Sequence, residues 1–232
     1  MKYPHSVYVI SAGRANNLPF NKKEKESFIF CVKSGEADQY RANGCLNVHE
    51  TGNLIDSRNF ALDHAFDQKH ICVQLSDDLK KVTTNSSFVD KSEKIPLTQA
   101  IDFMVDKLNT VSGLRLLGVP PTANAFYAKT IYSKNTFCIG DALFVKPSEP
   151  RFDTNLTLKE DYDFTLQHIQ RYSVCARYQR FLWEFQHYSN SGGAVSYRDD
   201  DREQKNINYL LRKWPRNLRL NPRRKNEILL KA

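Results

Sequence analysis

Short apolar runs alternate with segments of helical periodicity through the first half of this 232-residue chain. The apolar runs are rich in β-branched and aromatic residues and are predicted to be buried strands, at residues 6–12, 27–32, 45–48 and 70–75. Helices are expected over residues 36–42, 53–67 and 98–117, with the last one broken near Gly113. Because strands and helices alternate, the sequence predicts an α/β fold, a sheet with helices on its faces.

The second half of the chain has a less regular pattern. Residues 136–147 are expected to form two short strands or a hairpin around Gly140 and Asp141. Residues 158–173 are predicted to be a helix, with Thr157 and Glu160 at the spacing of a capping box.

Two more segments follow. Residues 174–186 either continue that helix or form a strand, and their aromatic residues favour a strand. A basic helix is expected over residues 202–213, ended by Trp214 and Pro215, with extended chain after it.

Polar residues follow two of the predicted strands directly. Ser11, Gly13 and Arg14 come after the first strand, and Ser76-Asp77-Asp78 comes after the strand at 70–75. Ligands of α/β sheets bind at the carboxyl ends of strands, so both segments are expected to line one crevice.

The chemistry of these two segments suits a phosphorylated ligand. Glycine lets the backbone approach a ligand, and arginine offers two parallel donors to a phosphate; the alternative is a tight turn with a surface arginine. Adjacent carboxylates such as Asp77 and Asp78 repel each other unless a divalent cation neutralises them, and that cation can bridge to a diphosphate. The alternative for this pair is an ordinary solvated turn.

Further candidate residues lie elsewhere in the chain. Glu160, Asp161 and Asp163 concentrate acidic residues at a predicted helix start, where one carboxylate can serve as a general base, although capping explains one or two of them. Arg58, in the helix at 53–67, could pair with a diphosphate or with the acidic pair; otherwise it is a surface residue. His187 could complete a metal shell, or lie unused on a strand edge.

The net positive charge is confined to one end of the chain. Residues 1–201 hold 24 basic and 24 acidic residues, whereas residues 202–232 hold 10 basic and 2 acidic ones, so the whole net charge of +8 lies in this C-terminal segment. Interleaved Tyr209 and Trp214 suit stacking beside phosphate contacts, which indicates a polyanion such as DNA; the alternative is a solubilising tail. The candidate contacts are Arg212, Lys213, Arg216, Arg219, Arg223 and Arg224.

Composition bounds the cellular setting. Five cysteines, an odd number without a Cys-x-x-Cys pair, indicate buried thiols in a reducing compartment. No apolar run approaches the ~20 residues that span a bilayer, and no signal-peptide pattern precedes Gly13. We therefore expect a cytoplasmic protein without a membrane partner; its oligomeric state stays open.

The motif order resembles that of known enzymes. The strand with Ser11-Ala12-Gly13-Arg14, the helix with Ser57-Arg58-Asn59 and the strand ending in Ser76-Asp77-Asp78 resemble the nucleotide-sugar half of GT-A glycosyltransferases, with Ser76 in place of the first acidic residue of the DxD-type motif. The later segments resemble the phage DNA-base glycosyltransferases, which are related to the glycosyltransferases associated with TET-type base oxidation. Those segments are residues 138–141, 144–145, 151–153, 158–164 and 192–198.

The resemblance implies a GT-A fold with a mixed, mainly parallel sheet between helices. It implies a catalytic domain over residues 1–201, with a nucleotide-sugar half over about 1–120 and an acceptor half over about 121–201, followed by a DNA-contacting extension over 202–232. It implies transfer of a sugar from a UDP-sugar, its diphosphate held by Mn²⁺ or Mg²⁺, to the hydroxyl of 5-hydroxymethylcytosine in DNA. A phage-encoded enzyme of this kind would work in the host cytoplasm.

The resemblance also assigns roles to residues. Asp161 is the expected catalytic carboxylate, with Glu160 and Asp163 in support, and Asp78 is the expected metal ligand beside His187. The residues expected to bind the nucleotide sugar are Ser11, Gly13, Arg14, Arg58 and Asp77. Three alternatives remain: a metal-dependent nuclease or phosphoesterase, a non-enzymatic nucleic-acid-binding protein, and sugar transfer to a protein or glycan.

Overall fold

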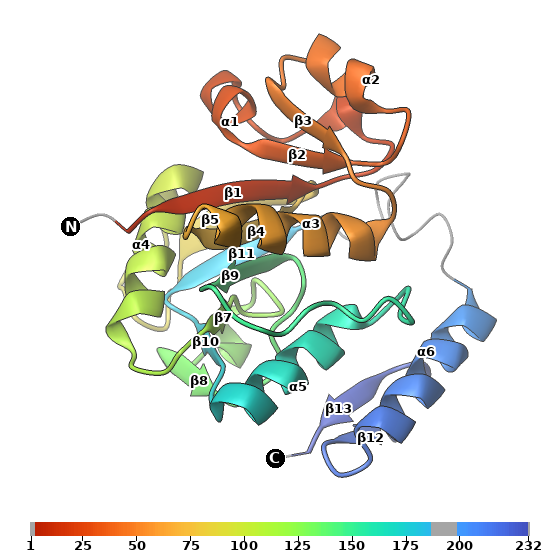
Figure 1. Ribbon diagram of the computed structural model, residues 1–232. Helices are drawn as coiled ribbons and strands as arrows, with labels where there is room; N and C mark the ends of the chain where they lie inside the picture. Colours follow the sequence, from red (N-terminus) through yellow and green to blue (C-terminus); the bar gives the residue numbers. More distant parts are fainter. Residues whose placement is uncertain (1–2, 187–198, 232) are drawn as a thin grey trace.

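A computed structural model describes residues 3–186 and 199–231 of the chain. Within these residues, eight strands form one sheet in the order β3-β2-β1-β4-β9-β7-β10-β8 (Figure 1). The strands are β1 (His5–Ile10), β2 (Ile29–Val32), β3 (Asn47–Glu50), β4 (Ile71–Ser76), β7 (Leu116–Gly118), β8 (Tyr132–Lys134), β9 (Ala142–Val145) and β10 (Ala176–Tyr178). This arrangement confirms the α/β fold.

The sheet is mixed but mainly parallel, as the resemblance implies. Strands β3, β2, β1 and β4 are mutually parallel, and β7 is parallel to β10. Strand β9 lies antiparallel between β4 and β7, and β8 is an antiparallel edge strand beside β10. The carboxyl ends of β1, β4, β7 and β10 therefore meet at one edge, which is called the carboxyl edge below.

A smaller sheet crosses the carboxyl edge. It consists of β11 (Phe181–Phe185), β5 (Leu79–Thr84) and β6 (Lys94–Ile95), in that order. Strand β5 starts directly after the Asp77-Asp78 turn that ends β4, and Leu79 pairs with Phe185. At the other end of β5, the Asn85 N–H donates to the Arg180 carbonyl, 2.9 Å away, just beyond β10. The small sheet thus spans from the end of β4 to the end of β10.

Helices cover both faces of the large sheet, which explains why its strands are apolar on both sides. Side chains of α2 (Ala37–Ala42) and α4 (Leu97–Thr110) pack with Val7, Val9 and Val73 in one core. Side chains of α3 (Leu54–Asp67) and α5 (Glu160–Tyr172) pack with Tyr8 and Cys72 in a second core on the opposite face. The remaining short helices are η1 (Ala15–Asn17), α1 (Lys22–Ser27) and η2 (Ala125–Tyr127).

The C-terminal segment folds into a helix and a hairpin that pack on α5, instead of forming extended chain after the helix; it is called the C-terminal unit below. Helix α6 (Asp200–Lys213) is followed by a hairpin of β12 (Leu218–Leu220) and β13 (Ile228–Leu230), and both lie beside α5 (Figure 1). A third core joins them to α5, and its buried members are Leu156, Leu166, Ile207, Leu210, Trp214, Leu218 and Ile228. The expected basic helix is confirmed, and the expectation of extended chain after Trp214 is corrected to a hairpin.

Three local expectations were wrong. The helix predicted over residues 98–117 with a break near Gly113 ends at Thr110; the break is confirmed by a turn with Gly113 at φ +75°, but the chain then enters β7 instead of resuming a helix. The hairpin predicted over 136–147 is the single strand β9, because β4 and β7 supply its partners. The capping box of Thr157 and Glu160 does not form; Lys159 precedes α5 in a left-handed conformation, at φ 60°.

No helix in residues 3–186 or 199–231 combines the length and the apolarity that crossing a bilayer requires.

Candidate active site

A buried polar network ties the end of β1 to the end of β4. The Asp77 carboxylate accepts hydrogen bonds from the Ser11 hydroxyl, 2.5 Å away, and from the Arg14 guanidinium. The Tyr40 hydroxyl of α2 donates to Ser11 over 2.6 Å and accepts from the Arg14 N–H over 3.3 Å. This network confirms that the two polar segments lie together at the carboxyl edge.

Burial dominates the electrostatics of this network. The side chains of Ser11, Arg14 and Asp77 are each at most 9% exposed. Burial raises the pKa of Asp77, and the neighbouring Asp78 raises it further, while Ser11 and Arg14 oppose the rise. Burial likewise raises the pKa of Tyr40 to about 12, so this phenol stays protonated and donates. Asp77 is therefore committed to protein partners.

Asp78 occupies the turn between β4 and β5. Its carboxylate is nearly buried and lies 4.0 Å from the Arg14 guanidinium. Gly13 lies on the turn after β1 with φ +70°, a conformation that favours glycine, and its N–H donates to Glu36 over 2.8 Å. The structure thus places Gly13 and Arg14 beside the acidic turn, as the sequence predicted.

Arg58 forms the second half of the site. The guanidinium is buried and donates to Glu160 over 2.9 Å, to Gln74 over 3.1 Å and to the Gly140 carbonyl over 3.0 Å. Its plane also lies over the Phe152 ring, 5.2 Å from the centroid. All three guanidinium nitrogens therefore have protein partners, and Arg58 joins α3, β4 and α5 instead of facing Asp77.

Asp161 lies at the start of α5 with a perturbed acidity. Its carboxylate accepts from the Gly140 N–H over 2.9 Å and from the Tyr162 N–H over 3.0 Å. Burial and the neighbouring Glu160 charge raise the pKa of Asp161 from 3.8 to about 7. A carboxyl group that titrates near neutrality is suited to proton transfer.

One backbone contact brings the two halves together. The Ser76 N–H, directly before Asp77, donates to the Asp141 carbonyl over 2.8 Å. Asp141 follows Gly140, which holds both Asp161 and Arg58. The acidic turn and the acidic start of α5 are therefore linked through two adjacent backbone contacts at the carboxyl edge.

Asp163 and the predicted DNA contacts belong to a different region. The Asp163 carboxylate is fully buried and accepts from Trp214 over 2.7 Å, from Gln167 over 2.6 Å and from Lys213 over 2.8 Å. Asp163 thus fixes α6 to α5 and is left out of the catalytic set below. Lys213 also pairs with Asp153 over 2.6 Å, so its charge is compensated within the fold.

The other predicted DNA contacts lie in the docked C-terminal unit. Arg224 pairs with Glu227 over 3.7 Å. The exposed side chains that form no ion pair within the described residues are Arg212, Arg216, Arg219 and Arg223. His187 lies outside the described residues.

Sequence reasoning missed two residues of the site. Gln74 is fully buried in β4, where it accepts from Arg58 and donates to the Arg58 carbonyl over 2.8 Å. A lone glutamine inside the apolar run of β4 was the signal for it. Tyr40 gave no comparable signal, because a tyrosine on a short helix usually packs in a core.

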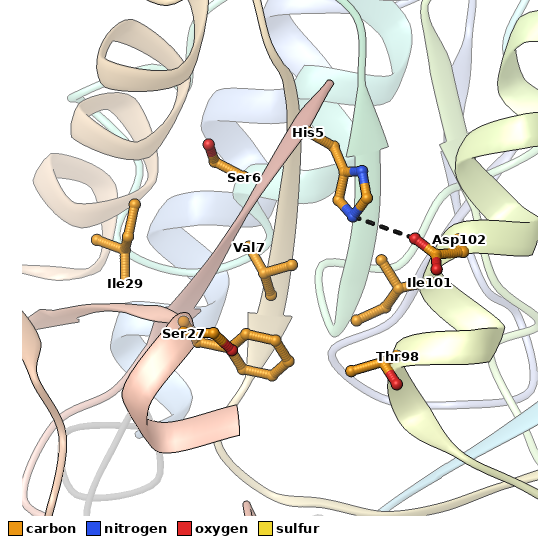
Figure 2. A pocket seen from close by; sticks show the side chains of 9 residues that line it. His5, Ser6, Val7, Ser27, Ile29, Thr98, Ile101 and Asp102 are labelled. Atoms are coloured by element: carbon orange, nitrogen blue, oxygen red, sulfur yellow. Dashed lines mark ion pairs between the residues drawn. The ribbon is translucent and has the colours of Figure 1, made fainter. Parts of the chain in front are cut away.

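Neither of the two described cavities coincides with this site. One, of about 280 Å³, is lined by His5, Asp102 and neighbours at the amino end of β1, on the opposite edge of the sheet (Figure 2). The other, of about 410 Å³, lies between α1 and the small sheet. Neither gathers the carboxylates and arginines described above, so the chemistry places the candidate active site at the carboxyl edge.

Comparison with known proteins gives one family. No curated protein sequence matches the chain. The model of the family described as TET-associated glycosyltransferase matches residues 5–193, which span the large sheet, the small sheet and both halves of the site. The chain therefore belongs to the TET-associated glycosyltransferase family.

Proposed function

We propose that this glycosyltransferase moves a sugar from a UDP-sugar to the hydroxyl of 5-hydroxymethylcytosine in DNA, with Mn²⁺ or Mg²⁺ at Asp78. The observation that carries the proposal is that Arg14 and Asp78 lie 4.0 Å apart at the carboxyl edge, where the Ser76–Asp141 backbone contact joins the acidic turn to the Gly140 segment that holds Asp161. Sheets of this kind bind nucleotides at that edge.

The donor would bind at the ends of β1 and β4. Gly13 leaves room for a close approach of the backbone, and Arg14 contributes positive charge near a diphosphate. Asp77 holds the Arg14 side chain, Ser11 in turn holds Asp77, and both act as positioning residues. Arg58 positions Glu160 and the Gly140 backbone, and so acts on the reacting centre only indirectly.

The residues at this edge fit a divalent cation. Asp78, in the turn that ends β4 and 4.0 Å from the Arg14 guanidinium, is the carboxylate that would hold the ion together with donor phosphate oxygens. Magnesium sites often use one or two carboxylates, substrate phosphates and water, so a larger cluster of side chains is not required. Such an ion would absorb the negative charge that develops on the departing UDP.

Asp161 is proposed as the general base. In the transfer, a bond forms between the hydroxymethyl oxygen and the anomeric carbon of the sugar, the bond from that carbon to the UDP oxygen breaks, and the hydroxyl proton passes to the Asp161 carboxylate. The pKa of Asp161, raised to about 7 by burial and by Glu160, matches this task near neutral pH. The Gly140 N–H fixes the orientation of the carboxylate.

The proposed DNA contacts are the exposed arginines of the C-terminal unit. Arg212 on α6, Arg216 after it, Arg219 on β12 and Arg223 in the hairpin turn present charge to solvent without an ion pair within the described residues. Phosphate groups are the natural partners of such a cluster.

The test is incubation of DNA that contains 5-hydroxymethylcytosine with a panel of UDP-sugars and Mn²⁺, followed by nucleoside mass spectrometry. We expect one nucleoside to gain the mass of a sugar residue, and Asp78→Asn to abolish the gain while the exposed control Asp106→Asn retains it. Unchanged nucleosides across the whole panel would refute the proposal. Strand cleavage without a donor would instead establish the nuclease alternative.

A further inference from the structure

Two aromatic side chains stand out from the loop that joins β7 to β8. Phe126 is 65% exposed and Tyr127 is 70% exposed, and both belong to the short helix η2. Their rings meet edge to face, with centroids 5.1 Å apart. Burial normally stabilises aromatic side chains, and these two adjacent rings are not buried. The exposed pair therefore points to a binding partner.

The loop holds the rings in a fixed position. The buried Asn85 side chain donates to the carbonyls of Ala128 and Gln179, each over 2.8 Å. The buried Gln179 side chain in turn donates to the Thr130 carbonyl over 2.8 Å. Two buried amides thus pin the backbone on one side of η2. Preorganised rings lose little conformational entropy on binding.

The loop starts and ends at the carboxyl edge. Gly118, at the end of β7, pairs with Leu143 of β9, and the adjacent Ala142 pairs with Leu75 of β4, two residues before Asp77. Tyr132, where the loop returns, pairs with Tyr178 at the end of β10. Three strand spacings of about 4.8 Å separate β4 from β10, a lateral offset of about 14 Å. The aromatic pair therefore shares an edge with the candidate active site.

The loop that carries the pair is positively charged. Residues 107–140 contain no aspartate or glutamate, and their basic residues include Lys129 and Lys134. The Lys129 ammonium lies over the Phe126 ring, 4.3 Å from its centroid, and Arg180 is exposed just beyond β10. Aromatic rings interleaved with cations suit a nucleic-acid strand, since bases stack on the rings and phosphates contact the cations.

We infer that Phe126 and Tyr127 form a stacking platform for unpaired bases of a DNA strand, with Lys129 contacting its backbone. The inference rests on the proposed function in one respect, the identity of the polymer as DNA. It adds a second contact region for that DNA besides the proposed C-terminal arginines.

A binding experiment tests the platform without requiring sugar transfer. Trp183 and Trp214 are both buried, so Tyr127→Trp supplies an exposed indole whose fluorescence reports directly on stacking. We expect a single-stranded oligodeoxynucleotide to quench this fluorescence, and a matched Tyr3→Trp control, exposed near the amino end of β1, to stay unquenched. Equal quenching in both variants, or in neither, would overturn the inference.

Alanine variants measure the contribution of each ring. We expect Phe126→Ala and Tyr127→Ala each to weaken binding of the oligonucleotide about tenfold, which corresponds to ~1.4 kcal/mol, with an unchanged salt dependence. Lys129→Gln is expected to reduce the slope of log affinity against log salt by about 0.7. Wild-type affinity in the double alanine variant would overturn the inference, as would a dimer of the wild-type chain that the double variant abolishes.

The outcome is separable from that of the proposed function. If the wild-type chain glycosylates 5-hydroxymethylcytosine and the double variant does so with an unchanged KM for DNA, the platform fails while the proposed function stands. If the oligonucleotide quenches Tyr127→Trp but no UDP-sugar is transferred, the platform stands while the proposed function fails.

Discussion

Replacement of Asp161 by asparagine is expected to stabilise the protein and to inactivate it. The pKa of Asp161 rises from 3.8 to about 7 on folding, mainly because the partly buried carboxylate is desolvated and secondly because Glu160 is close. Between these two values the unfolded chain releases a proton that the folded chain retains. Stability is therefore lost as the pH rises from about 4 to about 7, and the loss stays constant above that.

The magnitude follows from the same two values. The difference between 3.8 and about 7 corresponds to about 4 kcal/mol of destabilisation at pH 8, at about 1.36 kcal/mol per pH unit. Asparagine removes this penalty and can still accept from the Gly140 N–H, but the Tyr162 N–H loses its acceptor at a cost of about 1 kcal/mol. The net expected gain is about 3 kcal/mol at pH 8 and under about 1 kcal/mol at pH 5.

Urea unfolding at pH 5 and pH 8 measures this difference in the free energy of unfolding. In thermal melting at pH 8, at about 2–4 °C per kcal/mol, Tm should rise by about 6–12 °C. Loss of a general base should lower the transfer rate by at least about 10²-fold. A matched control on the same helix, Asp163→Asn, should instead lose stability by about 1.5–3 kcal/mol, because Trp214 and Lys213 donate to that carboxylate. An Asp161→Asn variant that gains no more stability at pH 8 than at pH 5 would refute the claim that Asp161 keeps its proton in the folded chain between about pH 4 and about pH 7.

Three further changes test the site and its surroundings. Gly140→Ala places a Cβ 2.5 Å from the Arg58 guanidinium, so it should lower stability by about 1–3 kcal/mol and reduce sugar transfer. The control Gly113→Ala adds a Cβ in open space, so it should lose only about 1 kcal/mol of stability and keep its activity. Arg14→Met leaves the Asp77 charge buried, and thermal melting should show a loss of about 3–5 kcal/mol together with weaker UDP binding in calorimetry. Each glutamine replacement among the exposed C-terminal arginines should lower the salt slope of duplex DNA binding by about 0.9, measured by fluorescence anisotropy, while UDP affinity stays constant. Those arginines are Arg212, Arg216, Arg219 and Arg223.

Regular elements of this fold could be predicted because local pattern and burial agree. Residues 53–67 have helical spacing, and α3 starts after Asn53, whose side chain and backbone form both contacts of a capping box. The strand at 70–75 is apolar on both sides because helices cover both faces of the sheet. The hairpin expected at 136–147 failed because the partners of β9 are distant in sequence, and no local pattern specifies them.

The site could be predicted in part, for a similar reason. Position at a strand end was enough to bring Arg14 and Asp77 together, since parallel strands end at one edge. The pairing of Arg58 with Glu160 joins residues 102 positions apart, whereas Glu160 was assigned to a local cap and to the support of Asp161. Helix spacing alone cannot tell a capping carboxylate from one that turns toward a distant arginine.

The charge of the C-terminal segment likewise did not predict how that segment packs. Net charge suggested an appended tail, but Trp214 and Ile207 are buried against Leu166 of α5, and Lys159 pairs with Glu203 over 2.8 Å at the start of the same helix. Helix α5 therefore carries Asp161 at its first turn and anchors α6 along its length. Removal of residues 202–232 would expose Leu166 and leave the Asp163 carboxylate buried without its Trp214 donor.

Such a truncation is expected to weaken UDP binding and DNA binding together, because it disturbs the helix that carries Asp161, the proposed general base. Charge replacement at the exposed arginines leaves the third core intact and should affect DNA binding alone. Calorimetry with UDP and anisotropy with DNA distinguish the two cases. A truncated chain that melts at the wild-type temperature and binds UDP normally would show that α6 and its hairpin are an independent appendage, as their charge alone had suggested.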